Sequence, residues 1–137
     1  MKRIIIIFVF FTTILNANNR YELKLYEKVL PFVFHKTPLI VFADKDANEI
    51  LKYSKKFKIV TKCKKAVVIL IGSDFLDIPD ECKDKPIFST SYRSFKNSEN
   101  SFGAFYWRKG RPQIKFKNKV LEKYNLTLPN FLRKYAK

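Results

Sequence analysis

Residues 38–43, which read PLIVFA, are the stretch that decides the fold class. Every residue from 39 to 43 is apolar, and a short continuous run with β-branched residues is typical of a strand buried on both faces. Residues 44–46 (DKD) end the run with side chains that favour turns. Residues 66–71 (AVVILI) form a second run of this kind, and six residues are too few for a buried helix. The two runs predict a mainly parallel sheet.

Helical and extended segments alternate around these two strands. Residues 47–57 place four apolar side chains on one helical stripe, with Asp46 as the expected N-cap. A helix is expected over 21–35, where Pro31 predicts a kink or an end. Further strands are expected at 58–61 and 86–90. The order predicts an α/β fold, a small mainly parallel sheet flanked by helices.

Residues 102–117 (FGAFYWRKGRPQIKFK) predict a C-terminal β-hairpin around the turn Lys109-Gly110. A two-residue turn sets Arg108 opposite Arg111 and, two positions further along each strand, Tyr106 opposite Gln113. One face is then apolar and is expected to be core, while the other carries polar and basic side chains. Terminal helices are expected over 119–124, capped by Asn118, and over 129–135.

Residues 1–17 have the pattern of a secretory signal peptide. Lys2 and Arg3 precede an apolar run over residues 4–15, and Ala17 supplies a small residue at the expected cleavage point. An uncleaved anchor is the alternative, but twelve apolar residues rise only about 18 Å as a helix, against about 30 Å of hydrocarbon core. We therefore expect residues 18–137 to form a single domain outside the cytoplasm.

The composition excludes several function classes. The 137 residues carry 28 Lys and Arg against 12 Asp and Glu, a net charge of +16, and 47% of them are hydrophobic. Such a chain is neither disordered nor a low-complexity linker. Two Cys and one His are too few for a four-ligand zinc module. In an exported protein this charge indicates an anionic envelope component or an acidic protein surface rather than nucleic acid.

Cys63 and Cys82 are expected to form a disulfide. An even pair of cysteines in an exported protein is a disulfide by default. Each cysteine precedes an expected strand, and the starts of two neighbouring parallel strands lie side by side, within bridging distance. Two reduced buried thiols are the alternative, and the chain has no Cys-x-x-Cys motif of a redox-active pair.

The polar face of the hairpin is a candidate site for an anion or an acidic partner. Arginine matches oxyanions bidentately, and facing arginines repel each other mildly unless an anion lies between them. A solvated sheet face is the alternative interpretation. The candidate residues are Tyr106, Arg108, Arg111 and Lys115 of the hairpin, together with Tyr92 and Arg93, which precede it.

No set of residues with a catalytic pattern is present in the sequence. His35, the only histidine, follows the first expected helix and suits a helix C-terminus better than a general base. Asp44 and Asp74 follow expected strands, where sites gather, but acids serve equally as caps and turn formers. We expect no enzyme activity, no cofactor and no metal site.

The C-terminal half resembles the YfiR/HmsC family of small periplasmic proteins. The resemblance covers residues 60–118 best, and its motifs are short. Its matching segments are 86–91 (PIFSTS), Phe95, 103–105 (GAF), 110–116 (GRPQIKF), Asn118, 126–129 (LTLP) and Leu132. Cys63 ahead of an apolar strand also resembles the family, whereas the family's usual cysteine in the first strand is replaced here by 40–42 (IVF).

The resemblance implies a non-enzymatic periplasmic regulator. Such a protein restrains an inner-membrane diguanylate cyclase, often with redox-sensitive disulfides and dimerisation. A binding module for an anionic ligand or envelope polymer, using the hairpin face, is the alternative function. Either partner places the protein at most at the periphery of the membrane.

Overall fold

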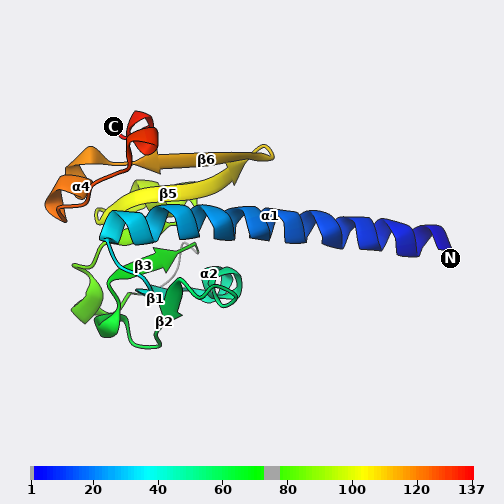
Figure 1. The fold of residues 1–137 in the computed structure, drawn as a ribbon, viewed down its shortest axis with the longest axis horizontal. Helices are drawn as coiled ribbons and strands as arrows, with labels where there is room; N and C mark the ends of the chain where they lie inside the picture. Colours follow the sequence, from blue (N-terminus) through cyan, green and yellow to red (C-terminus); the bar gives the residue numbers. More distant parts are fainter. Residues whose placement is uncertain (1, 73–77) are drawn as a thin grey trace.

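A computed structural model describes residues 2–72 and 78–137, with side chains described from residue 18 onward. One six-stranded sheet in the order β2-β1-β3-β4-β5-β6 organises the chain (Figure 1). The strands are β1 Leu39–Ala43, β2 Phe57–Ile59, β3 Val68–Ile71, β4 Ile87–Ser89, β5 Ser101–Arg108 and β6 Arg111–Phe116. The helices are α1 Lys2–Phe34, α2 Lys45–Leu51, α3 Tyr92–Asn97 and α4 Asn118–Lys123, with 3-10 turns η1 Cys63–Lys65, η2 Asp80–Cys82 and η3 Asn130–Tyr135.

The predicted fold class is confirmed. Strands β1 to β5 pair in parallel, and only β5 and β6 are antiparallel. Every residue of β3 and β4 is buried, and for β3 its continuous apolar run predicts this. The two edges of the sheet differ, because β2 has only three residues while β6 has six.

Helix α1 packs across the sheet through Tyr26, Val29, Leu30 and Val33, which are almost fully buried (Figure 1). The helix continues through Pro31 to Phe34, so it does not end at the proline. The buried side chains on both sides of the proline hold this part of the helix on the sheet. The helix also runs without interruption across residue 17, where we expect the signal peptide to end.

Helix α2 differs from its prediction at both ends. Asp44, not Asp46, is the N-cap, and its Oδ1 accepts a 2.9 Å hydrogen bond from the Ala47 amide. The helix ends at Leu51, because Phe57 is needed in strand β2, where it pairs with Leu39. Helix α3 was not predicted, and in α4 Asn118 is the first helical residue rather than the cap.

The predicted hairpin register is confirmed, with Arg108 opposite Arg111 and Tyr106 opposite Gln113. Lys109 and Gly110 both have positive φ, as a two-residue turn that follows the strand twist requires. The face predicted to be polar is, however, partly covered. Tyr106 is only 6% exposed, because helix α3 packs against this part of β5.

The predicted disulfide joins Cys63 to Cys82, with Cα atoms 6.1 Å apart. The two cysteines lie in η1 and η2, the turns that precede the parallel neighbours β3 and β4. They pack with Ile69, Ile71 and Ile87 in a small core of their own.

None of the helices that the structure describes is both long enough and apolar enough to cross a membrane.

Candidate functional site

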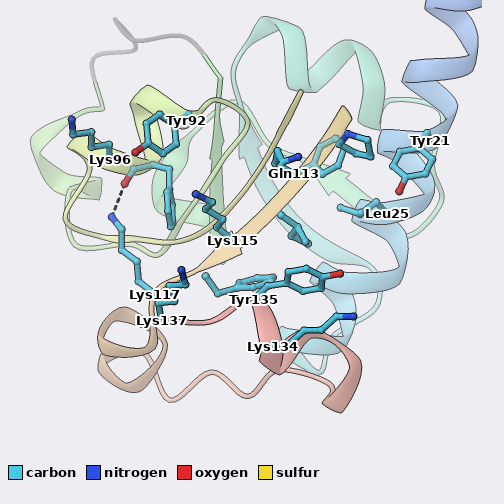
Figure 2. Close-up of a pocket in the computed structure, with 15 residues that line it drawn as sticks. Tyr21, Leu25, Tyr92, Lys96, Gln113, Lys115, Lys117, Lys134, Tyr135 and Lys137 are labelled. Carbon is cyan, nitrogen blue, oxygen red and sulfur yellow. Dashed lines mark hydrogen bonds between the residues drawn. The ribbon is translucent and has the colours of Figure 1, made fainter. Parts of the chain in front are cut away.

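A groove follows strand β6, the edge of the sheet, between helices α1 and α3 and the C-terminal turn η3 (Figure 2). It consists of two adjoining cavities of about 710 and 470 Å³. Both cavities are lined by Tyr21, Leu25, Ile114, Lys134 and Tyr135. We call this feature the β6 groove.

The charged residues that line the β6 groove are all lysines. There are seven of them, and no Asp or Glu is among the lining residues: Lys24, Lys28, Lys96, Lys115, Lys117, Lys134 and Lys137. Three ion pairs join described residues elsewhere, Lys52–Glu49, Lys64–Glu81 and Lys83–Asp80, and none involves a groove lysine. The groove therefore concentrates positive charge that the described part of the chain does not neutralise.

Exposed aromatic side chains gather in the same groove. Tyr21, Tyr92, Phe131 and Tyr135 are between 39% and 50% exposed, and they are four of the six large hydrophobic side chains recorded as exposed among the described residues. All four line the groove. Because apolar surface gathered in one place marks an interaction site, the clustering distinguishes this groove from an ordinary solvated face.

Several of these lysines lie over aromatic rings of the same groove. The Lys28 ammonium is 4.7 Å from the centre of the Phe131 ring, and that of Lys115 is 5.4 Å from the Tyr92 ring. Further pairs are Lys117 over Phe95 and Lys134 over Tyr135. Cation–π attraction holds the ammonium groups against the walls, so the lining alternates cations and rings.

Lys117 holds two walls of the groove together. Its ammonium donates to the backbone oxygens of Phe95 at 2.5 Å and Ser98 at 3.2 Å, which ties β6 to helix α3 (Figure 2). Burial lowers the pKa of this ammonium from its usual value. Two of its three donors are engaged, so we assign Lys117 to positioning the walls rather than to contacting a partner.

Glu22 fixes the α1 wall against the hairpin. Its carboxylate accepts a 2.5 Å hydrogen bond from Nε1 of Trp107 and a 3.4 Å bond from the Tyr26 hydroxyl. Burial raises the pKa of Glu22, and both hydrogen bonds oppose that rise. The neighbouring Tyr21 ring lies 5.8 Å from the Trp107 ring, so this contact sets where Tyr21 enters the groove.

The structure brings together only some of the residues singled out in the sequence. Tyr92 and Lys115 line the groove. Tyr106 lies beneath them, with its ring 5.5 Å from that of Tyr92, and its buried hydroxyl has no hydrogen-bond partner among the described residues.

The predicted arginines lie outside the groove. Arg108 and Arg111 face each other at the exposed tip of the hairpin, and Arg93 is exposed on helix α3. None of the three lines either cavity. The groove uses lysines in their place, drawn from α1, from α3, from β6 and the residue after it, and from the C-terminal segment.

Groove residues from α1 and from the C-terminal turn η3 were not predicted from the sequence. Tyr21 and Leu25 come from α1, and Lys134 and Tyr135 come from η3. The sequence indicated these residues only weakly, because they are aromatic residues next to lysines in segments that were expected to pack against the core. Only the fold shows that these segments meet along β6.

The other candidate groups have structural roles. The Asp44 carboxylate caps α2 and accepts a hydrogen bond from the Gly72 amide, and Asp74 lies outside the described residues. Cys63, Cys82 and Glu81 cluster closely enough to hold a metal ion. The two sulfurs are joined in the disulfide, however, and therefore offer no thiolate ligands.

Comparisons with protein-family models, with curated proteins and with solved structures found no match to this chain.

Proposed function

We propose that this chain is a non-enzymatic exported binding protein whose β6 groove receives an acidic segment of a protein partner. One observation carries the proposal: seven lysines and four exposed aromatic side chains line the groove, and no Asp or Glu is among its lining residues. Aromatic and basic residues provide large contact area and charge complementarity together. Such a groove attracts an acidic surface and repels a basic one.

The chemistry of the lining residues supports binding over catalysis. No Asp, Glu, His, Cys or Ser is among them, so the groove lacks the carboxylate, imidazole, thiol and serine groups from which most acid–base pairs and activated nucleophiles are built. Burial lowers the pKa of the Lys117 ammonium, but this group already donates to two backbone oxygens.

The resemblance to the YfiR/HmsC family supports a more specific form of this proposal. In that form the chain is a periplasmic regulator, and its partner is an inner-membrane signalling protein such as a diguanylate cyclase. The disulfide between Cys63 and Cys82 supports an oxidising compartment such as the periplasm.

Binding of poly-L-glutamate to the full chain tests the groove. Fluorescence of Trp107, the only tryptophan, reports occupancy through its contact with Tyr21. We expect Lys115→Glu/Lys134→Glu to weaken binding about tenfold, or 1.4 kcal/mol, because two attractions become repulsions. The control Lys55→Glu/Lys56→Glu makes the same charge change at exposed residues outside the groove, and we expect it to stay within about twofold.

Two results would contradict the proposal. Equal weakening by both variants would mean that total charge, not the groove, attracts the probe. Tighter binding of polygalacturonate than of poly-L-glutamate, lost in the groove variant alone, would move the partner class from proteins to envelope polymers.

For the regulator form, the wild type and the control variant should both recover an inner-membrane signalling protein from solubilised membranes, and the groove variant should not.

A further inference from the structure

We infer that the β6 groove binds its partner by strand addition: an extended peptide with alternating acidic and apolar residues pairs with β6 as a seventh strand of the sheet. This inference rests on the proposed function and specifies the conformation and sequence pattern of the acidic segment. It adds backbone pairing to the attraction between charges.

The first argument is the direction of the backbone groups of β6. The Lys117 amide donates to the Phe102 oxygen at 2.9 Å, which shows that residue 117 faces β5. Because inward and outward groups alternate along an antiparallel strand, Gln113 and Lys115 also face β5, while Pro112 and Ile114 face outward. The Ile114 amide and the carbonyls of Pro112 and Ile114 therefore point away from β5. They are the unpaired edge that a further strand needs.

The second argument is that the chain already adds an extended segment to this edge. Ala136 forms a parallel bridge with Phe116, and the Lys137 amide donates to the Phe116 oxygen at 3.1 Å. The C-terminal segment thus occupies the edge at Phe116, next to the residues whose groups remain unpaired. Strand pairing is therefore sterically allowed at this edge of the sheet. The part of β6 that the C-terminal segment does not cover, Arg111 to Lys115, spans about 17 Å as a strand.

The third argument is that the groove has two different walls on the two faces of the sheet. Figure 2 shows Tyr21 and Leu25 on one side of β6, and Tyr92 and Lys96 on the other. The wall beside α1 is the more apolar of the two, because Ile114 joins Leu25, Val29 and Leu132 there beside Lys24 and Lys28. The wall beside α3 is the more basic, because Lys115 joins Lys96 and Lys117 there. Alternate residues of a strand point to opposite faces. An added strand therefore places every second side chain against the mainly basic wall and the others against the mainly apolar wall.

Charge excludes a second copy of this chain as the occupant. Pairing two β6 edges would bring two lysine-lined grooves together in a protein of net charge +16. An acidic peptide neutralises that charge instead. A lipid surface or a nucleic acid would meet the lysines but would leave the outward amide and carbonyls of β6 unpaired.

Four synthetic octapeptides, each with four glutamate and four valine side chains, test the inference on the full chain. The first, the alternating peptide, has the sequence EVEVEVEV, and the second, the block peptide, has the sequence EEEEVVVV. The third and fourth are the alternating peptide with N-methyl groups on all glutamates or on all valines. Because only alternate amides of an added strand face β6, one N-methylated peptide should bind about tenfold more weakly and the other should stay within about threefold of the parent. The block peptide should also bind about tenfold more weakly, since its side chains do not alternate.

Amide hydrogen exchange supplies a second measurement. In the free chain the Ile114 amide should exchange quickly, and the Gln113 and Lys115 amides slowly, because only the latter two face β5. A saturating concentration of the alternating peptide should slow exchange of the Ile114 amide at least about tenfold. Poly-L-glutamate bound only through its charge would leave it unchanged.

The outcomes separate this inference from the proposed function. Equal affinity for all four peptides, with loss on Lys115→Glu/Lys134→Glu and no protection of Ile114, would overturn strand addition and leave an anion-binding groove. Equal effects of the two N-methylation patterns would also overturn it. Failure of every peptide and of poly-L-glutamate to bind would overturn both.

Discussion

Glu22 is a part-buried carboxylate whose ionisation costs stability. Because burial raises its pKa above the ordinary value of 4.5, the folded chain holds this proton more tightly than the unfolded chain. The contribution to stability is therefore fully present below pH 4.5 and is lost as the pH rises through the folded pKa. Glu22→Gln keeps an oxygen acceptor for Trp107 and removes the charge.

We expect Glu22→Gln to be more stable than the wild type at pH 7 and to lose that advantage at pH 4. Urea unfolding at both pH values, followed by Trp107 fluorescence, measures the difference. Glu22→Ala is the control, because it leaves the part-buried Trp107 donor without its acceptor and should destabilise the chain at both pH values. A Gln variant as unstable as the Ala variant at pH 7 would contradict this account.

Gly103 is a position where the packing between β4 and β6 leaves no space for a side chain. A Cβ added there would lie 2.6 Å from Cδ1 of Phe116 and 3.1 Å from Cε2 of Phe88. We expect Gly103→Ala to destabilise the fold by about 1–3 kcal/mol, because both rings are buried and must shift. Gly110→Asn is the matched control, since asparagine tolerates the φ of 74° and nothing lies within 4 Å. Urea unfolding of both variants measures the effect, and equal stability of the two would refute it.

The disulfide links the turns that lead into β3 and β4, so its loss should loosen the start of both strands. With a sequence separation of 19 between Cys63 and Cys82, its removal is expected to cost about 3 kcal/mol. The double variant Cys63→Ser/Cys82→Ser, compared with the wild type with and without reductant, measures that cost by urea unfolding. Reductant should destabilise the wild type and leave the double variant unchanged. A wild type insensitive to reductant would contradict the expectation, provided that reduction is verified by mass.

Elements with a regular pattern were predictable, and those set by local capping were not. The hairpin register followed from strict alternation around Lys109-Gly110, because a shift of one residue would bury its charges. Helix α3 has only six residues and depends on the Ser91 side chain, which accepts a hydrogen bond from the Ser94 amide. The α2 cap was misassigned to Asp46 because three consecutive residues, 44–46, offered two aspartates in cap positions.

Across the whole molecule, the groove could not be predicted, because its walls come from distant parts of the chain. Tyr21 and Tyr135 lie at opposite ends of the described domain, yet both line the groove beside Ile114. The composition showed an excess of basic residues, but it did not show where on the folded chain the lysines lie together. The hairpin pattern predicted a site at Arg108 and Arg111. In the fold these two arginines lie at the tip of the hairpin, and lysines lie beside the open edge of the sheet instead.

The unequal margins of the sheet limit how far association can proceed. At one margin, β2 has only three residues, and the exposed Lys58 lies in its middle. Short, charged edge strands resist pairing. At the other margin, β6 is longer and its outward groups remain unpaired. Because only β6 offers an open edge, a first added strand can pair with the chain at that edge alone, so complexes should hold their peptide at β6 and two chains should not join through β2.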